Sequence, residues 1–129
     1  MSRQKRETLD KIREDHVTRY RFAASRIKPQ SRVLDAACGV GYGSKLIEDA
    51  GNRVVGVDIS QEALDYAREH YSGPGYLLGS ILDKPWIGMF DALISFETIE
   101  HLSEPDKALK LFRDSVDGMF ICSVPNESM

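Results

Sequence analysis

Apolar positions along the chain follow two spacings, one typical of helices and the other typical of buried strands. Near the N-terminus, apolar residues such as Leu9 and Val17 recur at roughly helical intervals until Pro29 interrupts the pattern. The run RVLDAA (32–37) is instead short and almost continuously apolar, as in a strand covered on both faces. The pattern therefore predicts a helix over about 5–27, followed by a strand.

The same alternation of helix and strand patterns continues along the rest of the chain. Predicted strands occupy residues 53–60, 76–81, 90–96 and 118–126, and predicted helices occupy residues 44–51, 61–71 and 103–116. Gly51 is expected to close the helix before it, and Ser60 is expected to be the N-cap of the helix after it. Including the first strand, five strands alternate with helices.

Apolar strands that are joined by helices pair in parallel, because each helix returns the chain to the same end of the sheet. The predicted fold class is therefore α/β, with a doubly wound, mainly parallel five-stranded sheet. The length of 129 residues fits one domain, with an N-terminal helical segment at 1–31 and the core at 32–129. In such sheets, ligands bind outside the carboxyl ends of the strands.

Composition excludes several classes of protein. Hydrophobic residues make up 42% of the chain and charged residues 29%, which is unlike a disordered chain. No apolar run approaches the roughly 18 residues of a membrane span, and the N-terminus lacks the features of a signal peptide, so a cytoplasmic location is expected. Cys38 and Cys122 lie far apart without metal-ligand spacing, so neither a disulfide nor a zinc site is expected.

Charge is distributed unevenly around the net value of -3. Residues 1–32 carry ten basic and four acidic side chains, whereas the rest of the chain carries seven and sixteen. A basic arm on an acidic body can attract an anionic molecule such as a phosphate-bearing substrate or a nucleic acid. The solvated face of a helix gives the same pattern, and we expect this explanation rather than a nucleic-acid partner.

The stretch DAACGVGYG (35–43) places an acid and a glycine-rich turn after the first predicted strand. A dinucleotide-binding fingerprint reads G-x-G-x-x-G and directs a helix N-terminus at a pyrophosphate. Here Gly39, Gly41 and Gly43 are spaced two apart, and Asp35 precedes them. Because a carboxylate repels phosphate and attracts ammonium, the ligand is predicted to carry a cation near Asp35.

Asp58 ends the second predicted strand, 19 residues after Gly39. An acid in this place typically accepts hydrogen bonds from ribose hydroxyls. A ligand with a ribose, an amine and no pyrophosphate fits both acids, and S-adenosylmethionine is such a ligand.

Four motifs in order carry a family resemblance. They are VLDAACGVGYGS, VVGVDIS, FDALISFETIEHL and FICSVPN. With these motifs the chain resembles the class I S-adenosylmethionine-dependent methyltransferases over about residues 17–126. The resemblance implies a Rossmann-like core and methyl transfer to an acceptor, which we expect to be a small molecule or a sugar. It also implies that the usual strands after the fifth are lacking.

The resemblance assigns the methionine end of the cofactor to the first strand and its loop. Asp35 and the backbone around Ala37 and Gly39 would hold the amino group. Gly41 would let the cofactor lie close to the backbone. Phe96 would flank the sulfonium.

The remaining contacts would come from the next two strands and the first helix. Asp58 would bind the ribose and Ile59 would lie against the adenine. Ser80 and Ile81 stand in the adenine-binding motif, where Ser80 replaces the usual acid or is a plain loop serine. Arg19 and Tyr20 would reach the cofactor carboxylate from the first helix, or else pack at the surface.

The stretch ETIEH places Glu97, Glu100 and His101 at i, i+3 and i+4, on one face of a helical turn. It resembles the metal-binding E-x-x-E-H of ubiquinone-biosynthesis O-methyltransferases and small-RNA 2′-O-methyltransferases. We expect no metal here. Instead, His101 is the candidate general base, with Glu97 beside it, unless the cluster caps a helix or positions the substrate.

A methyltransferase needs little dedicated catalytic machinery, because the cofactor supplies the leaving group and the protein aligns the acceptor. The alternatives are a non-catalytic S-adenosylmethionine-binding module or partner subunit and, as a third candidate, a nicotinamide-dependent oxidoreductase. The fifth strand is expected to leave one edge of the sheet bare. A second copy of the chain or a partner subunit could cover this edge.

Overall fold

The computed structural model describes the backbone of residues 3–96 and 98–123, and the side chains of these ranges from Glu14 onward. Its helices are α1 (Arg3–Arg26), α2 (Tyr42–Asp49), α3 (Gln61–His70) and α4 (Pro105–Ser115), with short 3₁₀ turns η1 (Ile81–Asp83) and η2 (Ile99–His101). Its strands are β1 (Arg32–Ala36), β2 (Arg53–Asp58), β3 (Gly75–Leu78), β4 (Phe90–Ser95) and β5 (Val116–Cys122). The described chain thus alternates strands and helices as its apolar pattern predicts.

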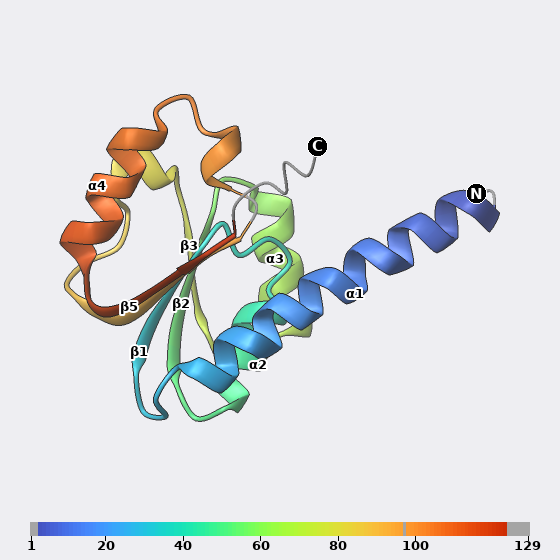
Figure 1. Cartoon of the computed structure of the whole chain (residues 1–129), viewed down its shortest axis with the longest axis horizontal. Coiled ribbons are helices and arrows are strands. Elements are labelled where there is room, and N and C mark those ends of the chain that lie inside the picture. The colour runs from blue at the N-terminus through green and yellow to red at the C-terminus, as the bar shows by residue number, and fades with distance from the viewer. Residues whose placement is uncertain (1–2, 97, 124–129) are drawn as a thin grey trace, which may run out of the picture.

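The five strands form one sheet in the order β3-β2-β1-β4-β5, and every neighbouring pair is parallel. This arrangement confirms the predicted α/β fold with a doubly wound sheet. The strand order reverses between β1 and β4, so the crevice outside the carboxyl ends of these strands is the expected ligand site. Figure 1 shows α4 on one side of the sheet and α1, α2 and α3 on the other.

Side chains of β1 point alternately into the two layers of the core. Val33 packs with Tyr20 and Ile47 on the α1–α2 side. Leu34 packs with Trp86 and Phe112 on the α4 side, and α4 contributes Phe112. A strand that is covered on both faces must be apolar at consecutive positions, and this explains the continuous apolar run in the sequence.

Two of the predicted helix ends are confirmed by their capping geometry. Ser60 accepts a hydrogen bond from the backbone N–H of Ala63 at 3.1 Å, as an N-cap does. Ala50 is the C-cap of α2, and Gly51 follows it with φ 104° and donates its N–H to the Glu48 carbonyl.

Several element boundaries differ from the predicted ones. β3 ends at Leu78, and the chain then turns into η1, whose N-cap is Ser80. α4 begins at Pro105, which lacks the N–H that a helix interior needs. β5 begins at Val116, two residues before its predicted start, and residues 124–126 of the predicted strand lie outside the described residues.

The outer edge of β5 has no neighbouring strand among the residues that the structure describes. Met119 and Phe120 on this strand are 39% and 36% exposed. Cys38 is buried, Cys122 is exposed, and both are free thiols. In the part of the chain that the structure describes, no helix is both long and apolar enough to span a membrane.

Candidate cofactor-binding site

A cavity of about 350 Å³ lies at the carboxyl ends of β1, β2 and β3. It brings together six of the residues that the sequence analysis singles out, namely Ala37, Asp58, Ile59, Ser80, Ile81 and His101. We call this cavity the cofactor cleft. Ala37 and Ile81 line the same cleft although they lie 44 positions apart along the chain. They meet because the loops that follow parallel strands lie at one end of the sheet.

Six further lining residues were not predicted. They are Val57, Gly79, Leu82, Thr98, Leu102 and Ser103. Gly79 directly follows β3, so its place at the end of an apolar run is a signal that sequence reasoning could have used. The Thr98 hydroxyl donates to the Phe96 carbonyl at 2.8 Å.

Asp58 connects the two loops that border the cofactor cleft. Its carboxylate accepts hydrogen bonds from the backbone N–H of Gly39 at 2.8 Å and from that of Ser60 at 3.0 Å. Each carboxylate oxygen can accept a second hydrogen bond, so the half-buried group keeps acceptor capacity for a ligand hydroxyl. The geometry therefore suits the ribose contact predicted for this residue.

Two glycines of the loop between β1 and α2 have different reasons for lacking a side chain. A Cβ at Gly39 would meet nothing within 4 Å, so the backbone there borders open space. A Cβ at Gly41 would lie 2.6 Å from the Cβ of Ala67 and 2.8 Å from the Tyr76 hydroxyl. The packing of α3 and β3 and a φ of 93° therefore both require a glycine at position 41, whereas its predicted contact with a cofactor stays a prediction.

Asp35 lies fully buried beneath the glycine loop. Its carboxylate accepts hydrogen bonds from the Tyr20 hydroxyl at 3.0 Å and from the Ser44 hydroxyl at 2.7 Å. Burial raises the pKa of this carboxyl to about 7, the two hydrogen bonds oppose the shift, and the charge of Asp58 adds to it. The geometry gives Asp35 a structural role, because its side chain has no exposed surface for direct contact with an ammonium group.

The three other residues expected at the methionine end do not line the cofactor cleft. Tyr20 is 2% exposed and Phe96 is 6% exposed, and their rings pack edge to face with centroids 5.0 Å apart. Arg19 is half-buried on α1. Because the Tyr20 hydroxyl is bonded to Asp35 inside the core, Tyr20 packs in the interior instead of reaching a cofactor carboxylate.

The cluster predicted from ETIEH is only partly described. η2 spans Ile99–His101, and Glu97 lies outside the described residues. His101 lines the cofactor cleft, with its Nε2 3.8 Å from the Glu100 Oε1. Among the described residues no group of three or more His, Cys, Asp or Glu side chains is placed to hold a metal ion.

The chemistry of the cofactor cleft distinguishes among nucleotide ligands. Its described lining contains one carboxylate, Asp58, and no Lys or Arg side chain. Ile59 is 75% exposed at its border, where a flat ring could cover it. A slot lined mainly by apolar side chains and a single acid suits a nucleoside, because ribose hydroxyls can donate to the carboxylate.

Residues 34–118 match the methyltransferase domain family. The chain belongs to this family. The chain is 31% identical over 99 residues to a "probable S-adenosylmethionine-dependent methyltransferase" of Mycolicibacterium smegmatis, over 73% of this chain and 38% of that protein. It is 30% identical to a ubiquinone biosynthesis O-methyltransferase of Shewanella halifaxensis, over 66% of this chain and 39% of that protein.

Solved structures of methyltransferases share this domain's fold. The magnesium protoporphyrin IX methyltransferase of Synechocystis with bound SAH superposes with a TM-score of 0.70 and 26% identity, over 89% of this chain and 55% of that one. This methyltransferase domain thus spans about two-fifths of the curated relatives named above. The cofactor of the family is S-adenosylmethionine, as the glycine loop and Asp58 predict.

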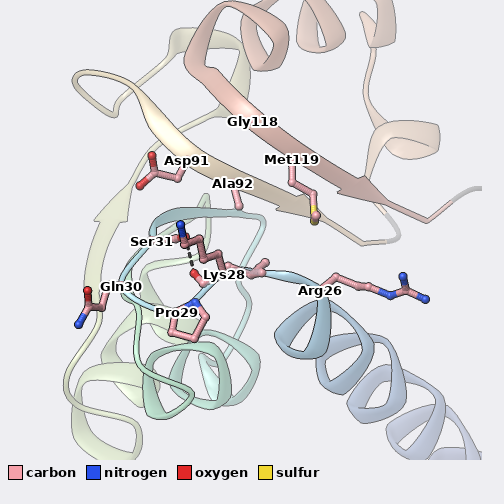
Figure 2. Close-up of a pocket in the computed structure, with 10 residues that line it drawn as sticks. Arg26, Lys28, Pro29, Gln30, Ser31, Asp91, Ala92, Gly118 and Met119 are labelled. Carbon is pink, nitrogen blue, oxygen red and sulfur yellow. Dashed lines mark hydrogen bonds between the residues drawn. The ribbon is translucent and has the colours of Figure 1, made fainter.

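A larger cavity, of about 790 Å³, lies at the opposite end of the methyltransferase domain's sheet. Figure 2 shows its lining, with Ser31 just before β1, Asp91 near the start of β4, and Gly118 and Met119 on β5. Parallel strands present their amino ends here, whereas ligands of doubly wound folds bind at the carboxyl ends. The cofactor cleft, by contrast, lies at the carboxyl ends of β1, β2 and β3.

Proposed function

We propose that this methyltransferase domain binds S-adenosylmethionine in the cofactor cleft and takes part in methyl transfer to a small-molecule acceptor. The observation that carries the proposal is the convergence of Asp58, Ile59 and Ser80 on a cleft without a Lys or Arg side chain in its described lining. These residues lie on different loops, and a nucleoside is the ligand that their chemistry shares.

The residues around the cofactor cleft would divide the work of binding. The Asp58 carboxylate would accept hydrogen bonds from the ribose, and Gly39 would hold that carboxylate in place through its N–H. Ile59 would cover one face of the adenine. Ser80 caps η1 by accepting from the Leu82 N–H at 3.1 Å, so its own role is to shape the cleft wall.

When bound, S-adenosylmethionine supplies a methyl group whose carbon bonds to the acceptor as its bond to sulfur breaks, the electron pair staying on sulfur and the acceptor losing a proton. His101 lines the cofactor cleft and is exposed, so its imidazole can receive such a proton. Alignment of the acceptor remains the main task of the protein. The ubiquinone biosynthesis and magnesium protoporphyrin IX methyltransferases named above differ in their acceptors, so similarity to them does not identify one acceptor.

Calorimetric titration of the chain with S-adenosylmethionine, S-adenosylhomocysteine and NAD tests cofactor choice. We expect the first two ligands to bind at one site and NAD not to bind, because Gly39, Gly41 and Gly43 depart from the spacing of the pyrophosphate-binding fingerprint. Binding of NAD alone would overturn the proposal. Methyl transfer from labelled cofactor to candidate acceptors then tests catalysis, and tight cofactor binding without transfer would favour a binding module or partner subunit.

A further inference from the structure

A second cavity, of about 490 Å³, adjoins the glycine loop and shares no lining residue with the cofactor cleft. Its lining consists of Val17, Val40, Tyr42, Tyr66 and Tyr71. We call it the tyrosine pocket. Its walls come from α1, the glycine loop, the start of α2 and the C-terminal half of α3. Three of the five lining side chains are therefore aromatic, and none is charged among the residues that the structure describes.

Hydrogen bonds hold the walls of the tyrosine pocket in place. The Tyr42 hydroxyl is hydrogen-bonded to the Nδ1 of His16 on α1. The Tyr76 hydroxyl donates to the Tyr71 carbonyl at 2.6 Å and lies 3.5 Å from the Gly41 carbonyl, so it connects the end of α3 to the glycine loop. A pocket with fixed walls binds a rigid ligand without a large ordering cost.

Apolar surface remains exposed around the tyrosine pocket. Tyr66 is 46% exposed and Val40 is 41% exposed. The Tyr66 ring stacks on His70 with centroids 4.0 Å apart and an interplanar angle of 4°, and its centroid lies 6.4 Å from that of the tilted Tyr71 ring. Exposed apolar groups around a hollow are typical of a binding site.

The tyrosine pocket lies close to the cofactor cleft along the chain. Ala37 lines the cleft, and Val40 lines the pocket. Three residues of fully extended chain span at most about 11 Å between Cα atoms, so the two cavities border opposite ends of one short loop.

We propose that the tyrosine pocket binds a neutral aromatic molecule that carries a hydroxyl group. This inference rests on the proposed function in one respect, namely that the ligand is the methyl acceptor, whose hydroxyl oxygen gains the methyl group and loses its proton. Each contact between a tyrosine ring and an aromatic ligand contributes about 0.5–1.5 kcal/mol to the binding free energy, in addition to the contribution of the buried apolar area. Tyrosine hydroxyls can also form hydrogen bonds with the ligand. Tyrosine rings also attract organic cations, but none of the described lining residues is a carboxylate that would neutralise one.

Catechol is the probe for the test, because it is neutral, flat and hydroxylated. The chain contains five tyrosines, so NMR of tyrosine-labelled protein reports on each ring. We expect catechol to shift the signals of Tyr42, Tyr66 and Tyr71 and to leave those of the buried Tyr20 and Tyr76 nearly unchanged. Absence of any shift, shifts confined to other tyrosines, or binding of tetramethylammonium in preference to catechol would overturn the inference.

Variants at Tyr66 make the test quantitative, because this side chain is partly exposed and its loss should leave the fold intact. Loss of one aromatic contact should weaken catechol binding about fivefold in Tyr66→Ala, whereas Tyr66→Phe should keep most of the affinity. Ile87→Ala, which removes an 84% exposed side chain outside the pocket, is the control and should bind catechol normally. Equal affinity in Tyr66→Ala and the parent would contradict the assignment.

Titration with S-adenosylhomocysteine separates this inference from the proposed function. We expect Tyr66→Ala to bind S-adenosylhomocysteine as the parent does, and catechol to bind the saturated complex as well. Displacement of catechol by S-adenosylhomocysteine would show one shared site and overturn the inference. If catechol binds but S-adenosylhomocysteine does not, the proposed function fails and the role as acceptor pocket fails with it.

Discussion

At the scale of single residues, the two acids of the sequence motifs have different roles in the structure. Asp58 lines the cofactor cleft, whereas Asp35 is fully buried and bonded to Tyr20 and Ser44. Sequence reasoning found both because acids at strand ends are unusual. It could not tell them apart, because the partners of Asp35 are a helix residue 15 positions before it and a serine nine positions after it.

The buried Asp35 should make folding stability depend on pH. Its pKa is about 7 in the folded chain and near 3.8 in an unfolded one, so between these values only the folded state holds the proton. The free energy of unfolding should therefore fall as pH rises from about 4 to about 7, by up to about 4 kcal/mol, and Asp35 should add no slope above that range. Urea unfolding across this range measures the effect.

Asp35→Asn supplies the control for that measurement, because an amide stays neutral throughout. In the variant, the free energy of unfolding should no longer fall with pH to the extent that Asp35 causes, while the contributions of other carboxylates remain. If this free energy depends on pH equally in the variant and the parent, Asp35 is ionised throughout or does not titrate in this range.

Asp58→Asn should weaken binding of S-adenosylhomocysteine. The change replaces one acceptor oxygen of the side chain that accepts from the Gly39 N–H and, in our proposal, from the ribose. We expect a loss of about 1–3 kcal/mol of binding free energy, which is roughly a five- to 150-fold loss of affinity. Calorimetry measures this affinity. Asp83→Asn, on the exposed surface of η1, is the matched control, and an unchanged affinity in Asp58→Asn would refute the ribose contact.

At the scale of elements, the apolar pattern predicted every strand and α-helix, but not where several of them end. β3 ends at Leu78, three residues before its predicted end, and the chain turns into η1, a 3₁₀ turn that is too short to show a helical apolar pattern. Ser60 was predictable as an N-cap because capping depends on neighbours in sequence. The tyrosine pocket was not predicted, because Tyr42 begins α2 whereas Tyr66 and Tyr71 belong to α3 and its C-cap, and the pattern does not reveal how these two helices pack.

The glycine loop allows a matched pair of substitutions. Gly39 and Gly41 both have positive φ values, 58° and 93°, but only Gly41 is tightly surrounded. Gly39→Ala should cost about 1–2 kcal/mol of stability from backbone strain. Gly41→Ala should cost a further 1–3 kcal/mol or so, because its methyl group would overlap Ala67 and Tyr76. Thermal unfolding of both variants measures the difference, and equal losses would contradict the packing explanation.

At the scale of the whole molecule, the outer edge of β5 is unpaired among the residues that the structure describes. The exposed strand carries Met119 and Phe120, and unpaired strand edges favour pairing with another chain. We therefore expect this chain to self-associate as its concentration rises, as sedimentation velocity would show. Met119→Lys should reduce the association, whereas Ile87→Lys, which adds the same charge away from β5, should not. A parent chain that stays monomeric at all concentrations would contradict this expectation.

A crystal structure of the chain with S-adenosylhomocysteine tests the central claim most directly. The account predicts the nucleoside in the cofactor cleft, with its ribose hydroxyls on the Asp58 carboxylate and its adenine against Ile59. A ligand bound instead in the larger cavity at the amino ends of the strands, beside Asp91 and Met119, would contradict it.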